Sequence, residues 1–450
     1  MVVYGKDKVL SLLEQVLSAS TADQCEAYLS GLSWGLTRFA NNYIHQNVHE
    51  DNALLTVRTV FGKKIGKAKT NQLDEDSIKE VVERAESITR AQQETEDFVS
   101  LPSPTPIQEV TTYYPQTADL TPQDRALTVK SAIDQCEEKN MQRVSGTYYT
   151  GVEEMGVMNS LGIEAYFQGT LSSFKINTLL EEGTGMGQHS ARNHEDLDIE
   201  KITDRACEKA LLSRNTENIP AGTYPVILEE AASCEMMGYL AAMAFSAQTY
   251  QEGRSAFSGN LEKKLAHESV TIWDDGLEGK GFPMPFDVEG VGKEKLTIME
   301  EGVAKGVAYD SYHAHREGKK STGHAIDAPG SIAAVPLNLF VKKGDMSLEE
   351  MISSCERAVL VTRFHYTNPM HPLKTIITGM TRDGTFWIEN GEITRGLKNF
   401  RFTQSILETL QGVEALSDRW GIQRMEYLKA SICAPAIQVK NFTFTGTTLF

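Results

Sequence analysis

Two histidines close together in the chain have the spacing that most directly suggests metal chemistry. His313 and His315 are separated by one residue. On a strand, the side chains of residues i and i+2 point to the same face, so both imidazoles could bind one ion. Asp310 or His324 would have to converge on this pair to complete the ligand set. The alternative interpretation is that both are surface histidines, and the sequence leaves the two interpretations open.

A second pair of histidines flanks a segment that contains proline. His365 and His371 lie within FHYTNPMHP, which we predict to be a loop because proline lacks a backbone donor. Loop residues serve binding more often than buried residues do. The glycines of Gly183–Gly187 lack the Lys and Ser/Thr of a phosphate-binding loop, so we predict a hairpin connection there. We expect no serine nucleophile on a strand-to-helix elbow.

The longest apolar stretch that we predict to be helical contains carboxylates but no histidine. Residues Val226–Ser246 are typical of a strand followed by a helix, and their candidate ligands are Glu229, Glu230 and Glu235. Carboxylates alone are poor ligands for zinc, which prefers imidazole and thiolate. We therefore predict a buried helix without a metal, packed on the β-rich part of the chain.

Composition argues against nucleic acid and membrane as partners. The 450 residues include 44 Lys and Arg against 61 Asp and Glu, a net charge of −17, and this charge opposes contact with phosphate backbones. We expect no bilayer-spanning segment, which would need about 20 apolar residues, and no signal peptide. The six cysteines are scattered without a C-x-x-C motif, a pattern typical of reduced thiols in the cytoplasm.

Hydrophobic periodicity predicts an α+β fold with two domains. The first, residues 1–219, is expected to be an α/β sandwich-like domain with an antiparallel sheet, interrupted by a Pro-rich connector near 101–107. Its predicted elements are a helix over 5–18, strands over 25–39 and 53–69 with Gly62 as a turn, and a helix over 74–93. After the connector follow a helix over 121–138 that begins at Thr121 and Pro122, three strands over 143–181 with a turn at 158–162, and a helix over 198–214.

The second predicted domain, residues 220–450, is β-rich and carries few helices. Pro220 and Gly222 mark its beginning. Its predicted helices cover residues 229–246, 347–357 and 403–416. The histidine-free helix therefore belongs to this domain and follows its first strand.

Six segments in a fixed order carry a resemblance to a known family. They are Thr37–Gln46, Val270–Thr297, Glu300–Gly323, Leu337–Ile352, Phe386–Gln404 and Ala434–Gly446. Together they resemble the TldD/PmbA family, once called modulators of DNA gyrase. In the TldD branch the helix after the first C-terminal strand carries an H-E-x-x-x-H zinc motif. At that place this chain has Met237, Gly238, Tyr239, Ala242 and Met243, and residues 416–430 lack the family's Cys ligand. The chain therefore resembles the metal-free PmbA/TldE-like branch.

The resemblance implies a barrel-like C-terminal domain and a non-catalytic role. It implies a heterodimer with a TldD-like subunit, with zinc only in that partner, acting on unfolded peptides in a shared chamber. Two alternatives stay open: the chain is itself a metallopeptidase with displaced ligands such as His313 and His315, or it is a homodimeric peptide-binding protein. Position in the signature segment or in the predicted loop gives five candidates for a peptide groove, namely Arg38, Asn41, His45, His365 and His371.

Overall fold

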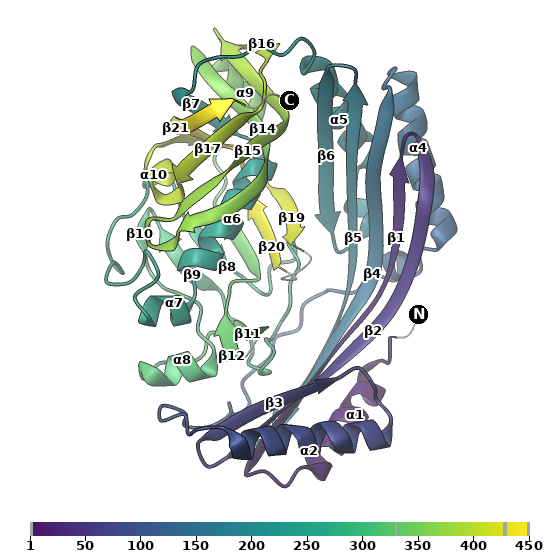
Figure 1. Ribbon diagram of the computed structural model, residues 1–450, viewed down its shortest axis with the longest axis vertical. Coiled ribbons are helices and arrows are strands. Elements are labelled where there is room, and N and C mark those ends of the chain that lie inside the picture. Colours follow the sequence, from purple (N-terminus) through teal and green to yellow (C-terminus); the bar gives the residue numbers. More distant parts are fainter. Residues whose placement is uncertain (1–2, 329–330, 426–429, 448–450) are drawn as a thin grey trace.

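The first half of the chain forms one long antiparallel sheet. The computed structural model describes residues 3–328, 331–425 and 430–447. The sheet has six strands in the order β3-β2-β1-β4-β5-β6 (Figure 1). The strands are β1 Gln24–Ala40, β2 Tyr43–Phe61, β3 Lys64–Thr70, β4 Arg143–Asn159, β5 Glu164–Leu180 and β6 Gly183–Ala191.

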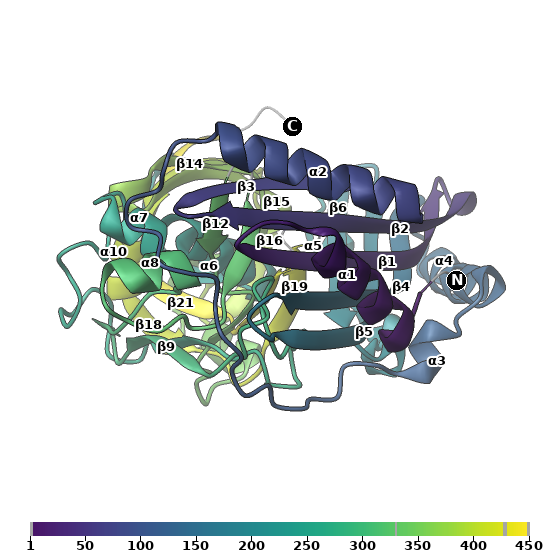
Figure 2. The same cartoon turned by 90° about the horizontal axis from the view of Figure 1, so that it is seen from below.

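Helices cover one face of this sheet and leave the other face to the C-terminal half. They are α1 Lys6–Ala19, α2 Glu75–Ala91, α4 Pro122–Glu138 and α5 Ile199–Leu212. Apolar residues of α1 and α2 share a core with Leu29 and Leu55, and those of α4 and α5 share one with Phe39 and Phe174. Leu29 and Phe39 have the same parity along β1, so all four helices lie on one face. Seen from below, α1 and α2 lie at the end of the sheet that carries β3 (Figure 2).

Helix starts follow the capping residues in the sequence. The Thr121 side chain accepts a hydrogen bond from the backbone of Asp124, and the Asp124 carboxylate accepts one from the backbone of Thr121, which makes a capping box with Pro122 in the first turn. The Asp74 carboxylate likewise accepts from the backbone N–H of Ser77 and begins α2. These two predicted starts are confirmed.

Two predictions for the sheet are wrong. Residues 143–181 form two strands rather than three, because β4 and β5 each continue for 17 residues on either side of the predicted turn. The glycines predicted to connect a hairpin lie inside β6. A Cβ on Gly183, Gly185 or Gly187 would lie 2.0–2.3 Å from a backbone carbonyl oxygen of α5, so these glycines let the helix pack directly on the strand.

The C-terminal half contains a closed β-barrel of five strands. β14 pairs with β7 and β15, and the path β7-β21-β17-β15 closes the ring. The barrel strands are β7 Gly222–Leu228, β14 Arg357–His371, β15 Ile376–Glu389, β17 Phe400–Ser405 and β21 Ile437–Thr447, with β16 Glu392–Gly396 beside β15 and β18 Val413–Leu416 beside β21. The expected barrel is confirmed.

A second sheet and several short elements complete this half. The sheet has the order β10-β9-β8-β13-β20-β19, with β8 Ile272–Asp274, β9 Leu296–Glu300, β10 Val303–Ala304, β13 Asn338–Val341, β19 Gly421–Met425 and β20 Ala430–Ala434. The remaining elements are α3 Pro115–Ala118, η1 His194–Asp196, α6 Glu230–Ala244, α7 Ala247–Gln251, α8 Ser311–Arg316, the hairpin of β11 Ala325–Ala328 and β12 Ser331–Ala334, α9 Leu348–Ser353, η2 Pro372–Lys374 and α10 Ile406–Gln411. No helix of the described residues is both long and apolar enough to cross a bilayer.

Two predicted C-terminal elements differ from the structure. The helix predicted over 403–416 is the six-residue α10 between β17 and β18, because the Ser405 side chain caps its start and Gly412 ends it. The segment around His365 and His371 is not a loop but belongs to β14. Irregular register beside Tyr366, whose φ is +51°, accommodates Pro369 within the strand.

Candidate functional site

Helix α6 occupies the place where the resemblance expects a metal helix. It lies between barrel and second sheet (Figure 1), and its sequence, EAASCEMMGYLAAMA, is apolar on nearly all sides. Met236, Met237 and Leu240 are fully buried in one core with strands of the barrel. A helix buried on several sides needs small and apolar residues rather than an amphipathic stripe. The predicted buried helix is confirmed.

The positions of the expected zinc ligands are filled by packing. A Cβ on Gly238 would lie 2.7 Å from the Cε atom of Met425 and 2.8 Å from Cδ1 of Ile432. The Tyr239 hydroxyl donates to the carbonyl oxygen of Thr367. Met243 is buried in the core. This side of α6 presents no imidazole or thiolate ligand set, and the residues present do not fit a zinc ion.

The carboxylates at the start of α6 are engaged by cations. Arg205 donates to Glu229 (2.8 Å) and Glu230 (2.7 Å), Lys209 binds Glu229, and Arg419 binds Glu230. Burial would raise the pKa of Glu230, but Arg205 lowers it to about 2. This cluster lies beside a cavity of about 710 Å³ between α5, β6 and α6. Arg205 and Lys209 belong to α5 of the first half, whereas Glu229 and Glu230 stand at the start of α6 in the C-terminal half. Their ion pairs therefore connect the two halves.

The structure separates His313 from His315. The strand predicted there is helix α8, since the Asp310 carboxylate caps it by accepting from the backbone of His313. Residues i and i+2 of a helix point to different sides, so His313 is buried against Asp310 (Nδ1 to Oδ2, 2.6 Å) while His315 is exposed. His324 is held by Asp274. Throughout residues 3–328, 331–425 and 430–447, no three His, Cys, Asp or Glu side chains form a group able to hold a metal.

A cavity of about 390 Å³ lies on the face of the first sheet that is turned to the C-terminal half. Its lining comes from alternate residues of β1, from β4 and β5, and from β19: Leu32, Trp34, Leu36, Arg38, Thr147, Tyr149, Ser173 and Arg424. The rings of Trp34 and Tyr149 stack with centroids 5.1 Å apart. Strand register brings Leu36, Tyr149 and Ser173 into one row. Partly exposed aromatic and aliphatic side chains beside a cationic group suit a peptide ligand.

The five groove candidates do not converge at one place. Arg38 lines the cavity. Asn41 makes the β1–β2 turn with φ +51°, and His45 is exposed on β2. His365 lies half-buried on the outer face of β14, where burial lowers its pKa and the charges of Arg363 and Arg382 lower it further. His371 is exposed at the end of the same strand.

Sequence reasoning missed most of the lining residues and one motif. Tyr149, Ser173 and Arg424 enter the cavity through strand register and the placement of β19. Residues 31–35 read GLSWG and match G-x-S-x-G, but Ser33 is buried within β1 rather than on an elbow between strand and helix. The motif is therefore present in the sequence, but its serine lies within a strand.

Models of the PmbA/TldA metallopeptidase domains match almost the whole chain. Domain 1 matches residues 25–89, the central domain residues 71–214 and the C-terminal domain residues 221–446. The chain belongs to the PmbA/TldD family. The recognition made from the sequence is thereby confirmed at the level of the family.

Individual relatives of this PmbA/TldD protein are distant in sequence. A protein of Methanocaldococcus jannaschii is 26% identical over 374 residues, covering 80% of this chain and 84% of its own length. The metalloprotease PmbA of Escherichia coli O157:H7 is 27% identical over 290 residues, 61% of either chain. The crystal structure of TldE from Thermococcus kodakarensis has the same fold, with a TM-score of 0.87 at 22% identity, covering 97% of this chain and 99% of that one.

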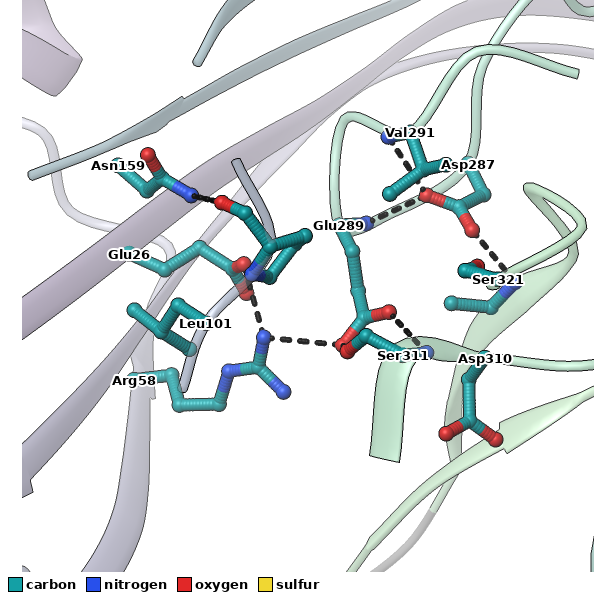
Figure 3. Close-up of polar contacts among 12 residues, drawn as sticks. Glu26, Arg58, Leu101, Asn159, Asp287, Glu289, Val291, Asp310, Ser311 and Ser321 are labelled. Carbon is teal, nitrogen blue, oxygen red and sulfur yellow. Dashed lines mark hydrogen bonds and ion pairs between the residues drawn. The ribbon is translucent and has the colours of Figure 1, made fainter. Parts of the chain in front are cut away.

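Family signature segments of this PmbA/TldD protein form a buried polar network (Figure 3). The Glu289 carboxylate accepts hydrogen bonds from the backbone and hydroxyl of Ser311 and binds Nη2 of Arg58 at 3.1 Å. The same nitrogen binds Glu26 at 2.8 Å. The Asp287 carboxylate accepts three backbone N–H groups of its own half. The segments Val270–Thr297 and Glu300–Gly323 therefore join the C-terminal half to β1 and β2 through this network.

Proposed function

We propose that this chain is the non-catalytic subunit of a TldD-type zinc metalloprotease and holds unfolded peptides for a zinc-bearing partner. One observation carries the proposal: in a family of metallopeptidases, this helix has Gly238 packed under Met425 and Ile432 where the active branch has a ligand. A fold can persist after its catalytic ligands are lost if its surface still serves a complex. The zinc, the partner interface and the peptide groove are all parts of this proposal.

The cavity between the sheet and the C-terminal half supports the peptide-holding part. Extended peptides bind through main-chain hydrogen bonds and pockets for alternate side chains. The Trp34–Tyr149 stack and the exposed Arg38 offer such side-chain contacts. The net charge of −17 and the six free, buried cysteines are consistent with a cytoplasmic complex that does not bind nucleic acid.

Metal content and assembly test the proposal directly. The purified chain should hold no stoichiometric zinc by elemental analysis after dialysis, because α6 lacks imidazole ligands. Mixed with a TldD-like chain, it should form a complex by size exclusion with light scattering, and that complex should cleave an unfolded peptide faster than the partner alone. One zinc held per chain would favour displaced ligands. If the chain forms a stable homodimer and does not bind the TldD-like chain, the result would favour the alternative function of a homodimeric peptide-binding protein.

A further inference from the structure

The cavity beside the first sheet has a charge opposite to that of the whole chain. Among the described residues that line it, both charged side chains, Arg38 and Arg424, are cations. The chain as a whole carries −17. A local charge of this sign within an acidic protein concentrates anionic ligands, because low-dielectric walls focus the field.

The sheet contributes two of the cations from one row. Arg38 lies opposite Thr147, and Thr147 lies opposite Lys175, so the two cations stand on the same face two strands apart. At a strand spacing of about 4.8 Å their Cα atoms are roughly 10 Å apart. The Arg38 guanidinium is exposed and donates to the neutral side chain of Gln46 at 3.3 Å. It therefore keeps its full charge toward the cavity.

The barrel carries two further cations whose charges reach the same histidine as the charge of Lys175. Arg363 and Arg382 lie opposite each other on β14 and β15, and one carboxylate, Asp383, binds Arg363. His365 lies two residues beyond Arg363. The pKa of His365 is lowered first by burial and then by Arg363, Arg382 and Lys175. Lys175 of the sheet and two cations of the barrel thus act on one imidazole.

Two of the described carboxylates near these cations are shared or largely buried. Glu153 is shared, with Arg192 on one oxygen and Arg424 on the other, each at 2.7 Å. Glu235 is largely buried, which raises its pKa, and it lies in the field of Arg363 and Lys175. Arg38 and Arg424 line the cavity, and Lys175 lies in one row with Arg38. The described carboxylates of this region include Glu153, Glu235, Asp383 and the exposed Glu50, which lies opposite Trp34.

We propose that this cationic lining selects extended peptides that carry a carboxylate side chain next to an apolar one. The inference rests on the proposed peptide-holding function and names the substrate class for it. Arg38 presents an exposed guanidinium group, which binds carboxylates through paired hydrogen bonds. Arg424 adds its charge from beside the cavity while it pairs with Glu153. The Trp34–Tyr149 stack, with Leu32 and Leu36, lies on the same strands and accepts the apolar neighbour.

Binding of matched peptides to the isolated full chain tests this preference. Three fluorescein-labelled unfolded peptides share one sequence with two variable positions beside Leu and Phe, filled by Glu, Gln or Lys. Their C-termini are amidated to remove the terminal carboxylate. By fluorescence anisotropy the Glu peptide should bind about tenfold or more tighter than the Lys peptide, as charge-assisted hydrogen bonds predict. Added salt should reduce the difference.

Two variants with a matched control locate the preference. Arg38→Gln removes the exposed cation of the lining, and the preference for Glu over Lys should fall severalfold. Arg382→Gln removes a barrel cation outside the lining, and the preference should fall less. Lys130→Gln removes an exposed cation on α4, on the opposite face of the sheet, and should leave the preference unchanged. Equal binding of all three peptides would overturn this inference and leave peptide holding intact. Failure to bind any of the peptides would overturn peptide holding itself.

Discussion

Removing Arg58 should destabilise the protein more than any exposed cation does. One nitrogen of this buried guanidinium serves Glu26 at 2.8 Å and Glu289 at 3.1 Å, and both side chains are at most 3% exposed. Arg58→Met keeps much of the volume but leaves two buried carboxylates without a cation. Breaking a buried ion pair on one side costs about 3–5 kcal/mol. Because Glu26 and Glu289 come from different halves, the loss falls on the junction between them.

Urea unfolding followed by circular dichroism measures this loss. With a slope of about 3 kcal/mol per M, the midpoint of Arg58→Met should fall by about 1–1.7 M. The matched control is Arg357→Met, since the pair with Glu389 is exposed by 66% and 32% and such pairs contribute at most about 1 kcal/mol. Adding Glu26→Gln and Glu289→Gln to Arg58→Met should recover most of the loss, because the buried charges are then gone.

The reasoning about Arg58 has two clear points of failure. A midpoint equal to that of Arg357→Met would mean that the Arg58 pairs contribute no more than a surface pair. A triple variant as unstable as Arg58→Met alone would mean that lost packing, and not uncompensated charge, causes the effect. Either result would mean that the ion pairs of Arg58 with Glu26 and Glu289 do not stabilise the junction between the two halves.

Two further predictions concern pH and packing. Burial raises the pKa of Glu26 to about 7 and that of Asp287 to about 8. The folded state therefore binds more protons than the unfolded state between about pH 4.5 and 8. The free energy of unfolding should fall as the pH rises through this window. Glu26→Gln should flatten the fall in urea midpoints measured from pH 5 to 8, and an unchanged slope would contradict the assignment. Gly185→Ala should lower the thermal midpoint by several degrees, because the new Cβ would lie 2.0 Å from the carbonyl oxygen of Ala206. Gly279→Ala is the control, since a Cβ at that position would have nothing within 4 Å and should leave the midpoint unchanged. Equal midpoints of the two variants would contradict direct packing of α5 on β6.

Local signals in the sequence were enough for many elements and for the missing metal ligands. Capping residues such as Thr121 and Asp74 act within one turn, so they are readable without knowledge of the fold. The lack of histidine in α6 is equally local. The error at His313 had a local signal too, because Asp310 is a good N-cap for the short helix that forms there. The prediction for the glycines of β6 was wrong because these glycines let α5 pack closely on the strand, a contact that the local sequence does not indicate.

The cavity and the barrel closure depend on contacts far apart in the chain. Trp34 lies in a predicted strand, but its stacking partner Tyr149 and the cation Arg424 reach it only through strand register and the fold of the C-terminal half. Periodicity predicts that a strand exists and leaves its neighbours undetermined. The network of Arg58 with Glu289 joins residues 231 positions apart, which no window of sequence contains.

The order of strands in the barrel has a consequence for how the chain acquires its structure. β7 is the first barrel strand to be synthesised, and its two neighbours are β14 and β21, the latter ending at Thr447. More than 200 further residues must therefore be synthesised after β7 before the barrel can close, and the apolar residues of β7 and α6 stay unburied until then. Pairings of such long range form slowly and leave unsatisfied strand edges exposed meanwhile. A chain interrupted before β21 would lack the strand that seals β7, which makes truncated or stalled products a natural target for chaperones.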